Sequence, residues 1–229
     1  MATYVLLHGA YQGGWIWQRV TPHLRAAGHT VFTPTLDGCA ERRHALRPGI
    51  DTETQAAEIV EQMFFEDVSD VVLVGTSCGG MVAARVAELA RERIGRIVLA
   101  DALALFDGER VSDHVKRPTA ATTELATGPS REDAANRMFV SLDPATKEWA
   151  LARYTPHPIA AMQAPVKLER FWDMTWKASV IWCRQSVNPP VAHQHRAADR
   201  LKAAWFELDT GHYPMLTEPA ALAGLIMQG

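Results

Sequence analysis

The sequence lacks the features that mark several classes of protein. It has three cysteines in 229 residues, Cys39, Cys78 and Cys183, and they form no C-x-x-C pair. Neither a disulfide framework nor a zinc site is therefore predicted, and we expect no bound metal. No apolar run is long enough to span a bilayer, and no basic segment followed by an apolar one stands near residue 1. We expect a cytoplasmic protein with no membrane partner.

The sequence also has little net charge. Lysine and arginine number 23, aspartate and glutamate 26, and the formal charge is −3, which argues against a nucleic-acid partner. Repeats and low-complexity segments are absent, and hydrophobic residues make up 48% of the chain. We therefore expect one α/β domain over residues 1–229 with a small-molecule substrate. A homodimer stays open.

What is present is an alternation of short apolar strands with helical patterns. The expected strands are at 4–7, 30–34, 71–74, 96–100, 179–183 and 203–208. The expected helices are at 15–27, 51–65, from the end of the third strand to about 93, from the 189–190 prolines to about 201, and at 218–227. Alternation with right-handed crossovers predicts a doubly wound, mostly parallel sheet of six strands.

The alternation lapses between about residues 106 and 178. Prolines and large side chains are frequent in this stretch, and we interpret it as an inserted helical cap over one end of the sheet. Most of its aromatic residues should form the core of the cap itself, while a few line a substrate pocket. The candidates are Trp149, Tyr154, Trp172 and Trp176.

A nucleophile is predicted where the third strand ends. Gly75-Thr76-Ser77-Cys78-Gly79 fits the G-x-S-x-G elbow, in which a strained turn exposes the serine hydroxyl above the sheet. Strand and helix approach too closely there for side chains at the two glycines. The alternative is a glycine-rich turn whose serine only caps the helix.

A base and an oxyanion hole can be placed around Ser77. His212 lies in a turn just after the last strand and is the best general base, whereas His193 and His195 fit a solvated helix start. The amides of Cys78 and Ala10 are the expected oxyanion donors. His8 should be structural.

The acid that would orient His212 is less clear from the sequence. The loop 184–189, which follows the strand expected at 179–183 and is the usual place for such an acid, has no carboxylate. Asp101 ends the strand beside that of the nucleophile, so we predict it as the acid, although it could equally cap a turn. Asn188 or Gln185 as a neutral orienter, and Asp209 three residues before His212, are the alternatives.

These motifs resemble a known family. They are Leu7–Ala10, Gly14–Trp17, Ala27–Val31, Gly75–Gly80 and Gly211–His212 with Leu216. They are similar to the α/β-hydrolase subgroup of plant methyl esterases, hydroxynitrile lyases and bacterial pyrethroid-hydrolase-like esterases. The resemblance covers about two thirds of the chain, and it implies a sheet of order 2-1-3-4-5-6 under a helical cap.

The resemblance favours hydrolysis. The lyases carry a threonine and a lysine where this chain has Gly9 and Tyr213. With Tyr11, these two residues complete the expected substrate-binding set. We expect a serine hydrolase that cleaves a small, fairly hydrophobic carboxylic ester through an acyl-enzyme, without a cofactor.

Two other functions remain open on the sequence. An acid at Asp101 resembles the cofactor-free dioxygenases of this fold, so a lyase or oxygenase using the His–Asp pair as a base is the first alternative. The second is a ligand receptor built on a hydrolase fold without turnover.

Overall fold

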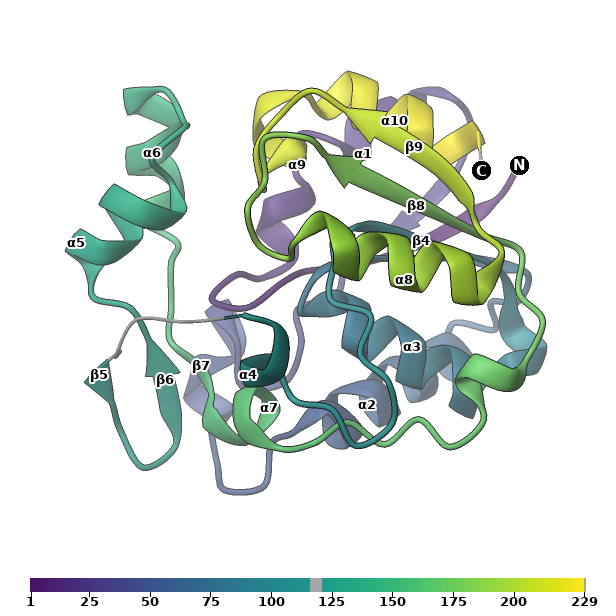
Figure 1. Ribbon diagram of the computed structural model, residues 1–229, viewed down its shortest axis with the longest axis horizontal. Helices are drawn as coiled ribbons and strands as arrows, with labels where there is room; N and C mark the ends of the chain where they lie inside the picture. The colour runs from purple at the N-terminus through teal and green to yellow at the C-terminus, as the bar shows by residue number, and fades with distance from the viewer. Residues whose placement is uncertain (116–120, 229) are drawn as a thin grey trace.

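The computed structural model describes residues 1–115 and 121–228. They form a central sheet with helices on both faces and a group of short elements standing to one side (Figure 1). Residues 116–120 of the predicted cap, Pro118 among them, lie outside the described residues. Within the described ranges, the helices are all too short or too polar to cross a bilayer.

The central sheet is the one the sequence predicts. Its strands are β1 (Thr3–Leu7), β2 (Thr30–Phe32), β3 (Val71–Ser77), β4 (Ile94–Ala102), β8 (Ala178–Cys183) and β9 (Ala204–Leu208). They run in the order β2-β1-β3-β4-β8-β9, and each neighbouring pair is parallel. Counted within this sheet alone, the order is the expected 2-1-3-4-5-6, because the labels β5 to β7 belong to strands outside it.

Each face of the sheet has its own hydrophobic core. The helices on one face are α1 (Thr21–Ala26) and α10 (Pro219–Gln228), and those on the other are α2 (Thr52–Phe65), α3 (Gly79–Leu89) and α8 (Val191–Leu201) (Figure 1). In β1, Tyr4 and Leu6 join the first core while Val5 and Leu7 join the second. Burial of both faces explains why the strands are continuously apolar.

One predicted helix is divided in two. The pattern over residues 15–27 suggested a single helix, but the structure has a 3₁₀ helix at Gly14–Trp17 and then α1, which restarts at Thr21. Pro22 explains the break, because its ring lacks an N–H and would clash with the carbonyl four residues earlier in a continuous helix. It is tolerated in the first turn of α1.

The insertion between β4 and β8 contains strands as well as helices. The helices are α4 (Val111–His114), α5 (Arg131–Asp133) continued by a π-helical turn at Ala134–Met138, α6 (Pro144–Leu151), α7 (Ile159–Gln163) and a 3₁₀ turn at Phe171–Asp173. The strands β5 (Ala121–Thr122), β6 (Ala126–Gly128) and β7 (His157–Pro158) form an antiparallel sheet. Strands of two or three residues leave no alternation to detect in the sequence.

Candidate active site

Ser77 has the backbone geometry of a nucleophile elbow. It is the last residue of β3, α3 follows it almost at once, and its φ is +49°. A residue with a side chain seldom adopts this left-handed region, and such strain is retained where the surrounding structure enforces it. The hydroxyl therefore stands at the carboxyl edge of the sheet, partly accessible to solvent.

The two glycines of the motif permit this turn. A Cβ at Gly75 would lie 2.7 Å from the carbonyl oxygen of Gly79, and a Cβ at Gly79 would lie 2.5 Å from the carbonyl oxygen of His8. These neighbours are backbone atoms and cannot move aside. Strand β3, helix α3 and the end of β1 approach each other as closely as the motif predicts.

His212 is bonded to Asp101. Its Nδ1–H donates to Oδ2 of Asp101 over 2.5 Å, and the carboxylate is fully buried at the end of β4. The φ of Asp101 is +46°, a second left-handed residue on the strand next to Ser77. This bond fixes the tautomer of His212, leaving Nε2 to accept a proton.

Two of the alternative orienters, Gln185 and Asp209, bond to each other. The amide of Gln185 donates to Oδ1 of Asp209 over 3.3 Å, and Arg184 lies 3.4 Å from Oδ2 of the same carboxylate. The carbonyl of Asn188 accepts a bond from the Ser186 hydroxyl. The loop after β8 has no carboxylate to offer His212. The carboxylate that bonds His212 is that of Asp101, on the strand next to Ser77.

The loop after β1 lies against the side chain of Ser77. A Cβ at Gly9 would be 2.6 Å from Cβ of Ser77 and 3.2 Å from its Oγ. Among the described residues no acceptor is bonded to the Ala10 amide, and that amide follows Gly9 directly. The predicted oxyanion donor of this loop is therefore available beside the hydroxyl.

His8 is structural, as expected from the sequence. Burial lowers its pKa to about 4, so the ring is neutral. Its Nε2 accepts a hydrogen bond from the Leu36 amide over 3.0 Å, and the Gly9 amide donates to Oε1 of Gln12. These bonds hold the Gly9–Ala10 segment in place.

Three of the predicted pocket residues join the site to the insertion. The rings of Tyr11 and Tyr154 are 5.6 Å apart, and the Tyr154 hydroxyl donates to the carbonyl of Pro129. The ring of Tyr213 is 5.2 Å from His212 and 4.9 Å from Phe139 of the insertion. The insertion therefore covers both the loop after β1 and the turn that carries His212.

The three predicted tryptophans have packing contacts instead. The indole N–H of Trp172 donates to the Leu105 carbonyl and that of Trp176 to the Phe171 carbonyl, and both rings belong to the core under α3. Trp149 packs edge-on against Trp15, with the Arg153 guanidinium 4.3 Å from its ring centre. These contacts are with residues other than Ser77, and a pocket role for the three tryptophans stays a prediction.

The prediction of a solvated helix start was wrong for His193 and Gln194, whereas His195 is exposed. They do not form a solvated helix start, since His193 and Gln194 are 4% and 1% exposed inside α8. Burial lowers the pKa of His193 to about 4, and its neutral Nε2 accepts a bond from the Ala104 amide over 2.9 Å. Gln194 Nε2 donates to Oδ1 of Asp101 over 3.4 Å. The buried face of α8 was readable from its spacing: His193, Gln194, Ala197, Ala198 and Leu201.

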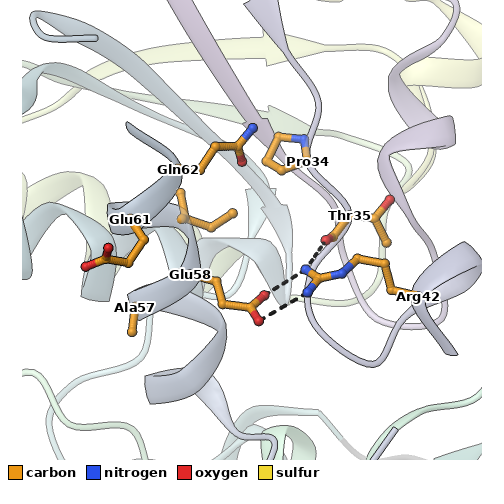
Figure 2. A pocket seen from close by; sticks show the side chains of 8 residues that line it. Pro34, Thr35, Arg42, Ala57, Glu58, Glu61 and Gln62 are labelled. Carbon is orange, nitrogen blue, oxygen red and sulfur yellow. Dashed lines mark hydrogen bonds and ion pairs between the residues drawn. The ribbon is translucent and has the colours of Figure 1, made fainter. Parts of the chain in front are cut away.

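A surface hollow of about 410 Å³ lies between α2 and the loop after β2, apart from all predicted site residues. Figure 2 shows the Arg42 guanidinium there, bonded to both carboxylate oxygens of Glu58 and to the Thr35 carbonyl. Its charge is already matched by protein groups.

Within residues 1–115 and 121–228, no three His, Cys, Asp or Glu side chains gather as metal ligands would.

The family is settled by a match over nearly the whole chain. The profile of the alpha/beta hydrolase family covers residues 4–225. The chain belongs to the alpha/beta hydrolase family. A match of this length includes the predicted nucleophile, acid and base, and it confirms the fold expected from the sequence.

Several members of the alpha/beta hydrolase family are similar to this chain in sequence. A carbendazim hydrolyzing esterase of Nocardioides sp. (strain SG-4G) is 38% identical over 109 residues, which are 48% of this chain and 45% of that protein. Methylesterase 3 of Arabidopsis thaliana is 30% identical over 142 residues, 61% and 51% of the two chains. The matched part spans about half the length of these relatives.

Solved structures of alpha/beta hydrolases share the fold. An extracellular alpha/beta-hydrolase from a Paenibacillus species superimposes with a TM-score of 0.81 at 23% identity, covering 100% of this chain and 98% of that one. A hydroxynitrile lyase and a pyrethroid hydrolase are also among the similar proteins. The similar proteins thus include the kinds of alpha/beta hydrolase that the sequence motifs resemble.

Proposed function

We propose that the chain is a serine esterase that cleaves small, fairly hydrophobic carboxylic esters through an acyl-enzyme. The observation that carries the proposal is the hydrogen bond from His212 to the buried Asp101, on the same sheet edge as the left-handed Ser77. The similar proteins that are esterases support ester hydrolysis as the reaction.

The first half-reaction forms the acyl-enzyme. Nε2 of His212 takes the Ser77 proton as Oγ attacks the ester carbonyl, and Asp101 stabilises the resulting imidazolium. The Ala10 and Cys78 amides donate to the oxygen on which negative charge develops. Collapse of this intermediate breaks the ester C–O bond, and His212 returns the proton to the departing alkoxide.

The second half-reaction releases the acid. Water takes the place of the alcohol and attacks the acyl carbon while His212 removes its proton. The same amides hold the oxyanion until the bond to Ser77 breaks, and His212 then returns the proton to Oγ. Aromatic rings near the candidate site support a small, fairly hydrophobic substrate: the Tyr213 ring is 5.2 Å from that of His212, and the Tyr11 ring on the loop after β1 is 5.6 Å from that of Tyr154.

The test is a burst experiment with p-nitrophenyl acetate. Wild type should release a burst of nitrophenol equal to the number of active sites, and Ser77→Ala should abolish both the burst and steady turnover. Ser69→Ala, an exposed serine just before the start of the same strand, is the matched control and should behave as wild type. Absence of turnover on any short ester would contradict the proposal.

A second candidate keeps the site and changes the reaction. The Asp101–His212 pair could act as a base toward an acidic substrate proton, giving a lyase or a cofactor-free oxygenase. The acid after β4, in place of the loop after β8, favours this candidate. Ser77→Ala would then retain much of the activity on such a substrate.

A further inference from the structure

The buried carboxylate of Asp101 has two oxygens, and only one of them serves His212. Oδ2 accepts from Nδ1 of His212, while Oδ1 accepts from Nε2 of Gln194. A fully buried charge without partners on both oxygens is costly. Gln194 lies in the first turns of α8, which packs against β8 on one face of the sheet (Figure 1), so the second partner comes from a helix of the main fold.

The same helix holds the backbone beyond Asp101. The Ala104 amide donates to Nε2 of His193, one residue before Gln194. Arg196 donates to both carboxylate oxygens of Glu109 over 2.6 and 2.8 Å and reaches the Ala104 carbonyl over 3.4 Å. The segment that follows Asp101 is therefore fastened to α8 at several points, and this supports the left-handed backbone of Asp101 itself.

The chemistry of the side chain suits this position. A glutamine offers an N–H donor without adding charge next to the carboxylate, whereas a lysine or arginine would neutralise Asp101 and weaken its effect on His212. The amide nitrogen must face Oδ1, because the amide oxygen is itself an acceptor and would repel the carboxylate oxygen. At 1% exposure no bulk water can replace the bond.

We propose that Gln194 is a positioning residue: its amide holds Oδ1 of Asp101 so that Oδ2 stays directed at Nδ1 of His212. The catalytic part of this inference rests on the proposed function. The geometric part, a Gln194-dependent Asp101–His212 bond, can be measured without any substrate.

The experiment compares Gln194→Met with wild type. Methionine keeps nearly the length of the side chain and removes the amide that donates to Asp101. Gln62→Met is the matched control, since Gln62 is a half-buried glutamine on α2 that lines the surface hollow. Proton NMR follows the His212 Nδ1 proton, which resonates far downfield when bonded to a carboxylate and is assigned by its loss in His212→Ala. Kinetics with p-nitrophenyl acetate are normalised to active sites counted by a fluorophosphonate probe.

In Gln194→Met, we expect the resonance of the His212 Nδ1 proton to shift or to disappear through exchange with water. We expect kcat per active site to fall by about tenfold, the loss that corresponds to one hydrogen bond to a charged group, with KM nearly unchanged. Gln62→Met should match wild type in the His212 resonance, in kcat per active site and in the number of active sites. A purely structural role would lower the number of active sites instead of kcat per site.

An unchanged resonance with unchanged kcat in folded Gln194→Met would overturn the proposal. Gln194→Ala, which cannot overfill the site, is measured in parallel, and loss of folding in both variants would assign Gln194 to the core and overturn it as well. Should wild type cleave no ester, the proposed function fails while the resonance still decides the role of Gln194.

Discussion

At the scale of single residues, the site is built from backbone conformations that side chains seldom adopt. Tyr11, Ser77 and Asp101 all have positive φ, at 68°, 49° and 46°. Each follows or ends a strand of the central sheet, and each such residue costs roughly 1–3 kcal/mol. The sheet and its two cores hold these three conformations. Other described residues with side chains and positive φ, Ala40, Asp67, Asp70 and Lys202, lie elsewhere in the chain, so left-handed backbone is not confined to the candidate site.

Asp101→Asn tests the acid at this scale. We expect kcat for ester hydrolysis to fall by about 10⁴-fold, because an asparagine amide can hold His212 in the tautomer that cannot accept the serine proton. Steady-state kinetics and thermal unfolding check the result, with the melting temperature expected to stay close to that of wild type.

Asp209→Asn is the control for that variant. Asp209 is the other carboxylate near His212 in sequence, but it bonds Gln185 and Arg184, so kcat should stay within about twofold of wild type. Equal losses in the two variants, or near-normal turnover of Asp101→Asn, would remove Asp101 from the proposed mechanism.

At the scale of elements, the contact between β1 and α3 depends on Gly79. Gly79→Ala would place a Cβ 2.5 and 2.6 Å from the carbonyl oxygens of His8 and Leu7. Because these atoms belong to the backbone, we expect the free energy of unfolding to fall by about 1–3 kcal/mol. Urea unfolding followed by circular dichroism measures it.

Gly224→Ala provides the comparison within another helix. Gly224 lies in α10, and a Cβ there would meet no atom within 4 Å. Alanine should therefore stabilise the protein by about 0.5–1 kcal/mol through helix propensity. If both glycine variants changed stability in the same direction, close packing would not be the reason for Gly79.

The elements also show how far the sequence alone could lead. Ser77, Asp101 and His212 were predictable because each directly follows or ends an apolar strand, and the carboxyl ends of parallel strands share one edge. The break near Pro22 was overlooked because amphipathic spacing continues across it. The three-stranded sheet of the insertion has no local signal, and Trp172 could be assigned to the core only once its neighbours were known.

Gln194 shows a different limit. It lies in the run His193-Gln194-His195, which was interpreted as an exposed helix start because an H-x-H pattern without matched carboxylates is a weak sign of a metal site. The pairing with Asp101 joins residues 93 positions apart, and no local pattern records a partner so distant. Buried polar groups that serve other buried polar groups are therefore the part of a site that a single sequence reveals least.

At the scale of the whole molecule, two buried histidines link stability to pH. Burial lowers the pKa of both His8 and His193 to about 4, against about 6.5 for an exposed imidazole. Between these values the unfolded chain binds a proton at each position and the folded chain does not. Stability therefore falls as the pH is lowered through this range.

We expect the free energy of unfolding to be nearly constant above about pH 6.5 as far as these two groups are concerned. Below it, each histidine should remove up to about 1.4 kcal/mol per pH unit down to about pH 4. Denaturant unfolding at pH 7, 6 and 5 measures the trend. A stability that rose between pH 7 and 5 would contradict the neutral state of both rings.

The transfer of the acid to β4 changes what the rest of the chain is free to do. Ser77 and Asp101 end adjacent hydrogen-bonded strands, whose spacing of about 4.8 Å is set by the sheet itself. In the proposed mechanism, the connection 184–189 consequently holds no catalytic group. We therefore expect insertions, deletions and substitutions in this connection to lower the catalytic rate less than they would in a hydrolase whose acid lies in that loop.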